Sequence, residues 1–274
     1  MNIRYEKTPE SFFTAVLQKQ INGGTDFLVE QKVYDEPDLF SWQTETAPNK
    51  SILECHPGGS RNDTSCSTPA LNDILTNYLS LFPGLNPFDN PDQYDEFLER
   101  IFYALHHGAS RKVSVIEKTI LQSMNKGVSY VLEKMSMEAV QFARLASEVA
   151  REIHQAKAFI RLVPLETPKI LFGEWELNHE TIYFIMKHFL RRFPEYTILL
   201  LTGTQAYAGQ GSEIWEETID RRQLNLPAKK DEFLDEWLTF YQSQYIPQRK
   251  NIKLFKKHVP QKYWKFMEEV RGAA

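Results

Sequence analysis

The stretch MEAVQFARLASEVAREIHQAKAFIRLVPL, residues 137–165, decides the fold of this chain. Its first part carries apolar side chains at helical spacing, from Phe142 to Ala156, which predicts a long helix with one buried face. The apolar period then changes from helical to alternating, which predicts a strand over residues 159–164. A helix that runs directly into a strand is typical of a domain in which helices pack on a sheet.

Apolar stripes elsewhere predict more helices before this stretch and a mixture of helices and strands after it. One predicted helix begins at Pro9, with Thr8 as its cap and Phe12 to Leu17 on its buried side. The other predicted helices are 71–82, 94–106, 113–135 with a break near Gly127, 182–193 with Asn178 as its cap, and 231–244. The predicted strands are 38–46, 170–177, antiparallel to the strand before it, 196–201 and 212–219.

These patterns predict an α+β protein. Its N-terminal half is expected to be largely helical, and its C-terminal half to hold a small, mainly antiparallel sheet packed by helices. We expect one integrated domain over residues 1–274, because helices before and after the sheet carry apolar stripes that need it. Residues 47–69, rich in Pro, Gly, Asn, Ser and Thr, are predicted to be a flexible loop.

Composition excludes several classes of protein. No apolar run approaches the length of a membrane span, and the N-terminus shows no secretory signal pattern, so we expect a cytoplasmic protein. Cys55, His56 and Cys66 offer three zinc ligands, but the fourth ligand and the paired spacing are missing. Incidental thiols in a loop explain them better, so we assign no metal and no cofactor.

The net charge of −4 hides an asymmetry along the chain. Residues 1–110 carry 7 basic and 16 acidic side chains, whereas the remainder carries 25 basic and 20 acidic side chains. Residues 246–267 hold seven Lys or Arg and no acidic residue, interleaved with aromatic side chains. Cations neutralise phosphates and aromatic rings stack on unpaired bases, so this segment predicts nucleic-acid binding. The alternative is a solvated tail docked by its aromatic residues.

A second candidate site lies at the junction between the long helix and the strand after it. His154 can act as an acid or base near neutral pH, and Arg161, on the predicted strand, can clamp a phosphate in bidentate fashion. We assign both as candidate catalytic residues. The alternative is a histidine bound to the backbone and an arginine paired with Glu152 or Glu174.

The chain resembles the domain-of-unknown-function family 4130 in a series of short motifs. The motifs are Glu152-x-His154-x-x-Lys157-x-Phe159-x-Arg161, His179, His188-Phe189, Arg192-Phe193-Pro194, Ile246-Pro247-x-Arg249-x-Asn251, Leu254 and His258-x-Pro260-x-Lys262-Tyr263-Trp264-Lys265, with a core over about 137–267. The start of the chain is similar too, at Phe12-Phe13-x-Ala15-Val16 and Asp38-Leu39-Phe40. Ala158 and Val259 stand where the family pattern has Gly and Met.

The resemblance implies a protein of DNA metabolism or repair. Family members are often encoded beside a radical-SAM protein, and some are fused to a uracil-DNA-glycosylase-like domain, so either is a candidate partner besides DNA. We expect a nucleic-acid-binding accessory factor. The alternatives are an enzyme that acts on damaged or modified bases through a His/Arg pocket, and a protein-interaction scaffold for the radical-SAM partner. The candidate nucleic-acid-binding residues are Lys157, Arg192, Arg249, Lys250, Asn251, Lys253, Lys256, Lys257, His258, Lys262, Tyr263, Trp264 and Lys265.

Overall fold

The computed structural model of the chain describes most of its predicted elements. The described residues are 2–31, 71–82, 84, 86, 90–165, 169–203, 205–217, 234–244, 246, 248, 251, 253–255, 259 and 264. They belong to two compact units, Met1–Ala150 and Arg151–Ala274, called here the N-terminal unit and the C-terminal unit. The prediction of one integrated domain concerns both units together and stays a prediction. The predicted loop 47–69 with its two thiols lies outside the described residues.

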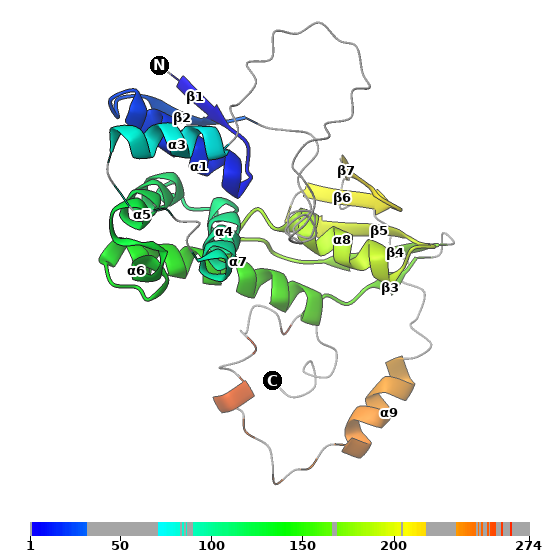
Figure 1. Ribbon diagram of the computed structural model, residues 1–274. Helices are drawn as coiled ribbons and strands as arrows, with labels where there is room; N and C mark the ends of the chain where they lie inside the picture. Colours follow the sequence, from blue (N-terminus) through cyan, green and yellow to red (C-terminus); the bar gives the residue numbers. More distant parts are fainter. Residues whose placement is uncertain are drawn as a thin grey trace, which may run out of the picture. The chain divides into compact units, whose positions relative to one another are not determined.

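The N-terminal unit begins with a strand, a helix and a second strand (Figure 1). Strand β1 (Asn2–Tyr5) pairs in parallel with β2 (Phe27–Glu30), and α1 (Pro9–Ile21) connects them. Thr8 caps α1 as predicted, because its Oγ1 accepts a hydrogen bond of 3.2 Å from the Ser11 N–H. The sequence patterns did not predict this small parallel sheet.

The rest of the described part of the N-terminal unit is helical, as the sequence predicts, and the strand predicted over residues 38–46 lies outside the described residues. Its helices are α3 (Leu71–Leu81), α4 (Pro91–Leu105), α5 (Lys112–Lys126), α6 (Val128–Leu132) and the first part of α7 (Met137–Phe159). Gly127 separates α5 from α6 with a φ of 90°, a backbone conformation that favours glycine. The core of the unit includes Phe12, Phe97, Ile116 and Phe142, all fully buried.

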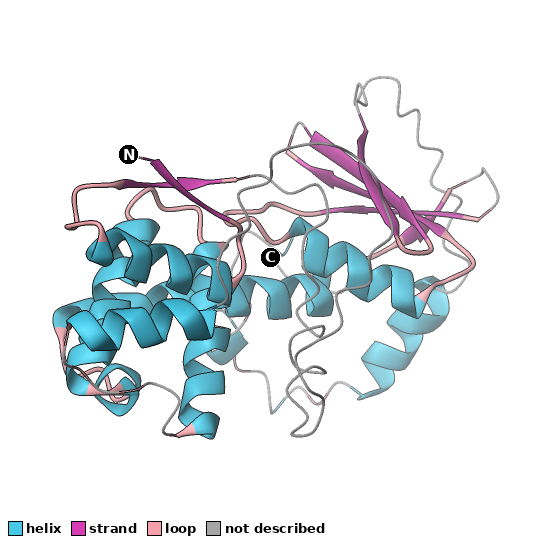
Figure 2. Ribbon diagram, turned by 45° about the horizontal axis from the view of Figure 1, so that its top comes forward, coloured by secondary structure: helices cyan, strands magenta, loops and turns pink. Residues whose placement is uncertain are grey.

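The C-terminal unit holds one five-stranded sheet in the order β3-β4-β5-β6-β7 (Figures 1 and 2). Its strands are β3 (Val163–Pro164), β4 (Ile170–Glu174), β5 (Thr197–Thr202), β6 (Gln205–Gln210) and β7 (Glu213–Glu217). Three of its four strand pairings are antiparallel, and the parallel pair β4–β5 is joined through α8 (Ile182–Arg192). Helix α9 (Leu234–Gln244) follows the sheet in the chain. The predicted α+β class, with a small, mainly antiparallel sheet in the C-terminal half, is therefore confirmed.

The end of α7 and helix α8 share one apolar core with the sheet. Ala156 and Ile160, four residues apart, belong to the same buried cluster as Ile185 of α8 and Ile198 of β5. This shared core holds the last turns of α7 against α8. The polar residues on these two helices are positioned by the same packing.

The junction after residue 156 differs from the prediction. Helix α7 continues to Phe159, and β3 contains only Val163 and Pro164. The Ile160 N–H still donates to the Ala156 carbonyl at 3.0 Å, so the helical pattern carries Ile160 into the core. Arg161 consequently follows the helix end and is exposed, and it does not lie on a strand face.

No helix in the described part of the chain combines the length and the apolar character that a membrane span needs.

Close packing around Gly173 of β4 gives a test of the C-terminal core. A Cβ atom added there would lie 3.0 Å from the Cδ2 atoms of Leu162 and Leu200, and 3.1 Å from Ile160 Cγ2. Gly173→Ala is expected to lower the free energy of unfolding by about 1–3 kcal/mol, because these neighbours must shift. Urea unfolding followed by circular dichroism measures the loss. Combined with Leu162→Ala, which removes one crowding methyl group, the two costs should be less than additive; additive costs contradict the crowding.

Candidate functional site

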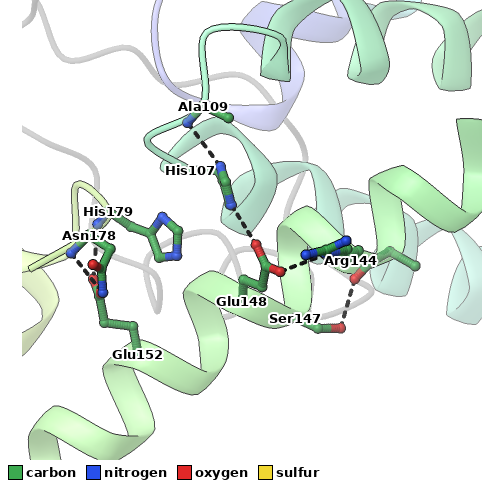
Figure 3. Close-up of polar contacts among 9 residues, drawn as sticks. His107, Ala109, Arg144, Ser147, Glu148, Glu152, Asn178 and His179 are labelled. Atoms are coloured by element: carbon green, nitrogen blue, oxygen red, sulfur yellow. Dashed lines mark hydrogen bonds and ion pairs between the residues drawn. The ribbon is translucent and has the colours of Figure 1, made fainter. Parts of the chain in front are cut away.

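Glu152, on α7, is a buried carboxylate that binds the turn before α8. It is only 3% exposed and accepts four hydrogen bonds. Figure 3 shows Glu152 beside two of its partners, Asn178 and His179. Asn178 donates through its backbone N–H at 2.8 Å and its side-chain Nδ2 at 2.9 Å. The His179 N–H donates at 3.2 Å and Thr181 Oγ1 at 2.7 Å. Two donors reach each carboxylate oxygen, so the buried charge is stabilised by dipoles.

This contact corrects the predicted role of Asn178. The N-cap residue of α8 is Thr181, whose hydroxyl donates to Glu152 instead of capping the helix. A negative carboxylate just before a helix N-terminus also interacts favourably with the helix dipole. Glu152 therefore ties the turn before α8 to α7, although it accepts no hydrogen bond from the first N–H groups of α8 itself.

Helix α8 carries three basic side chains near its C-terminal end. His188 and Arg192 lie one turn apart and so share one side of the helix, and Arg191 precedes Arg192. His188 is half-buried, while Arg191 and Arg192 are exposed. Cations at the C-terminal end of a helix are favoured by its dipole, which accounts in part for these three side chains. The dipole of α8 does not account for Lys157, which lies on α7.

Lys157 of α7 joins these residues across the shared core. It directly follows Ala156, which packs in the same cluster as Ile185 and Phe189 of α8. Burial lowers the pKa of Lys157 below its ordinary value, and repulsion from Arg191 lowers it further. We call Lys157, His188, Arg191 and Arg192 the α7–α8 cationic cluster.

His188 experiences the charge of every other member of the cluster. Its pKa is lowered first by burial and then by repulsion from Lys157, Arg192 and Arg191. Within the described part of the chain, Lys157, His188 and Arg192 form no ion pair with a carboxylate. The cluster is therefore a positive surface whose own charges repel one another, an arrangement that an anion would stabilise.

The structure brings some of the predicted residues together and leaves others apart. Lys157 and Arg192, both predicted as nucleic-acid-binding, each lie near His188, and His188 and Arg191 were not among the predicted nucleic-acid-binding residues. His154 is exposed on α7, and Arg161 donates a hydrogen bond of 3.3 Å to the Ala158 carbonyl. The pairing of His154 and Arg161 in a catalytic pocket stays a prediction.

Parts of the predicted C-terminal interface are described. Asn251 caps a short helical turn, since its Oδ1 accepts from the Leu254 N–H at 2.9 Å. Trp264 lies 5.3 Å from the Phe255 ring, and its Nε1 donates to the Val259 carbonyl at 3.0 Å. Lys253 is exposed. The remaining candidates lie outside the described residues: Arg249, Lys250, Lys256, Lys257, His258, Lys262, Tyr263 and Lys265.

The N-terminal unit contains a polar cluster that the sequence did not reveal. His107 Nδ1 accepts from the Ala109 N–H at 3.0 Å, so Nε2 carries the proton and donates to Glu148 at 2.9 Å (Figure 3). Arg144 Nε donates to the other oxygen of Glu148 at 2.7 Å. The hydrogen bonds from Arg144 and then from His107 lower the pKa of Glu148 to about 2. The spacing of Arg144 and Glu148 on one helix was a usable signal, but the distant His107 was not.

Removing the carboxylate charge of Glu152 tests its role. Glu152→Gln is nearly isosteric, but its amide nitrogen places a donor against the donors of the 178–181 turn. We expect the free energy of unfolding to fall by about 1–3 kcal/mol, because buried donors lose their acceptor. Chemical unfolding measures the loss, with Glu133→Gln, an exposed carboxylate, as the control. An equal effect of the two substitutions contradicts the role of Glu152.

The titration of His188 tests the geometry of the cluster. Lys157→Met is expected to raise the pKa of His188 towards its ordinary value of 6.5, because it removes the strongest of the three repelling charges. NMR titration of the imidazole signals measures the shift. Lys187→Met is the matched control, because the Lys187 ammonium lies over the Tyr183 ring at 4.6 Å and does not contribute to the lowering. An unchanged midpoint in Lys157→Met places Lys157 away from His188.

Comparison with known proteins supports the resemblance found in the motifs. No curated protein matches the chain. Residues 110–269 match the model of a domain of unknown function, DUF4130. The match covers more than half of the 274 residues and includes Glu152 and the whole α7–α8 cationic cluster. The predicted family is confirmed, and the chain belongs to the DUF4130 family.

Proposed function

We propose that this protein is a nucleic-acid-binding accessory factor of DNA metabolism or repair. The α7–α8 cationic cluster carries the proposal, because it gathers cations from two helices, and among the described residues no carboxylate forms an ion pair with Lys157, His188 or Arg192. The basic and aromatic composition of residues 246–267 supports it independently.

The energetics of the cluster favour a polyanion as its ligand. Burial and mutual repulsion disfavour the charged forms of Lys157 and His188, as the lowered pKa of each shows. A phosphate placed among these side chains would reverse the repulsion and accept hydrogen bonds from the Arg192 guanidinium. Binding should therefore raise the pKa of His188 and be coupled to proton uptake.

The DNA context of the proposal comes from the family resemblance. A radical-SAM protein or a uracil-DNA-glycosylase-like protein is the partner that this resemblance suggests, and the accessory factor would bring nucleic acid to it. An enzyme that uses His154 and Arg161 is the alternative. The hydrogen bond from Arg161 to the Ala158 carbonyl gives no support to a shared pocket, so binding is the better-supported function.

Neutralising the cluster tests the proposal. The double variant Lys157→Gln/Arg192→Gln is expected to bind a fluorescent oligonucleotide about tenfold more weakly than the unmodified chain near physiological salt. The slope of log affinity against log salt should become shallower by about 1.4, at about 0.7 for each lost phosphate contact on a single strand. Fluorescence anisotropy at several salt concentrations measures both quantities.

A charge-matched control separates the cluster from net charge. Lys118→Gln/Arg151→Gln removes the same charge from two exposed positions outside the cluster and should leave binding nearly unchanged. Reversing Lys253, Lys256 and Lys257 to Glu tests the C-terminal segment in the same assay. If the unmodified chain binds no oligonucleotide, or if both double variants weaken binding equally, the proposed role of the cluster is wrong.

A further inference from the structure

An aromatic pair lies directly beside the α7–α8 cationic cluster, at the end of α8. The Arg192 guanidinium lies over the Phe193 ring, 5.5 Å from its centroid. The Phe193 and Tyr196 rings meet edge to face, with centroids 6.3 Å apart and planes at 85°. The Tyr196 side chain is partly open to solvent, with 37% of its surface exposed. The cation Arg192 and the exposed ring of Tyr196 therefore lie close together, with Phe193 between them, in residues 192–196.

The backbone around Tyr196 is held on both sides. The Tyr196 N–H donates to the Phe193 carbonyl at 3.0 Å, which closes the turn after α8. The next residue, Thr197, begins β5 and donates to the Lys169 carbonyl at 2.8 Å. The turn and the strand fix the backbone of Tyr196, and packing against Phe193 limits the freedom of its ring, which lowers the entropy cost of binding a ligand.

Glu195, the acidic residue next to Tyr196, has a cation of its own. Glu195 precedes Tyr196, and its carboxylate lies 3.7 Å from Lys169 Nζ in an exposed ion pair. Lys169 thus offsets part of the charge of Glu195. A ligand that combines phosphates with flat apolar rings matches both parts of the surface.

We propose that the nucleic acid bound here is single-stranded, with an unpaired base stacked on Tyr196 and the flanking phosphates on Lys157, His188 and Arg192. This inference rests on the proposed function and specifies its ligand. In a duplex the faces of the bases are covered by their neighbours, so Tyr196 would gain no stacking and only the cations would contribute. An open strand offers its base faces and its phosphates at the same time.

The test compares three ligands of equal length with the full chain at one salt concentration: a fluorescent oligo(dT), an abasic strand with the same phosphates, and a duplex. The unmodified chain should bind oligo(dT) about tenfold more tightly than either other ligand. Tyr196→Ala should abolish the preference for oligo(dT) over the abasic strand, and Tyr196→Phe, which keeps a ring, should retain it. Trp215→Ala is the matched control, because Trp215 of β7 is similarly exposed, at 40%.

The outcomes separate this inference from the function on which it rests. Binding to all three ligands with equal affinity, or an unchanged preference in Tyr196→Ala, overturns the single-strand inference and leaves the proposed function intact. No binding to any ligand overturns both. If Tyr196→Ala does not fold, as judged by thermal unfolding, the comparison of the three ligands with the unmodified chain still decides.

Discussion

The buried carboxylate of Glu152 is the interaction on which the candidate site depends. A charge in the interior is costly unless donors surround it, and here four donors from the 178–181 turn do so. The carboxylate sits on α7, five residues before Lys157, and the turn that it binds leads into α8. One polar contact and one apolar cluster, which contains Ala156 and Ile185, therefore hold the two helices that present the cations.

This arrangement explains how like charges can gather on one surface. Repulsion within the α7–α8 cationic cluster opposes the folded state, and the Glu152 contact and the apolar core offset it. Functional surfaces often keep unfavourable charge interactions that lower the stability of the folded protein, because the same charges can bind a ligand. Under the proposed function, an anionic ligand would relieve this repulsion.

The long amphipathic helices could be predicted from sequence because each one buries a continuous stripe. The break at Gly127 and the cap at Thr8 follow from local chemistry and were also predictable. Strands β1 and β2 were missed because each has only four residues and neither shows a clear apolar alternation. The strand expected after residue 156 was misplaced because short apolar runs fit either period, and the core of the C-terminal unit selected the helix.

The site was only partly predictable for a different reason. Lys157 and Arg192 belong to motifs that the chain shares with the family. Tertiary packing brings each of them near His188, which the motifs do not predict. The donors to Glu152 include backbone N–H groups of residues 178 and 179, to which no side-chain pattern points. No sequence pattern pointed to Tyr196 as a binding residue. Its candidate role depends on its exposure and on its position beside Phe193 and Arg192, which only the structure shows.

The hydrogen-bonded group of His107, Arg144 and Glu148 has a consequence for acid tolerance. The pKa of Glu148 is lowered to about 2 in the folded chain, against an ordinary value of 4.5. The stabilisation that this carboxylate gives is therefore complete above pH 4.5 and disappears only as the pH falls towards 2. Mild acidification of the surroundings would leave this link between two helical segments of the N-terminal unit charged and intact.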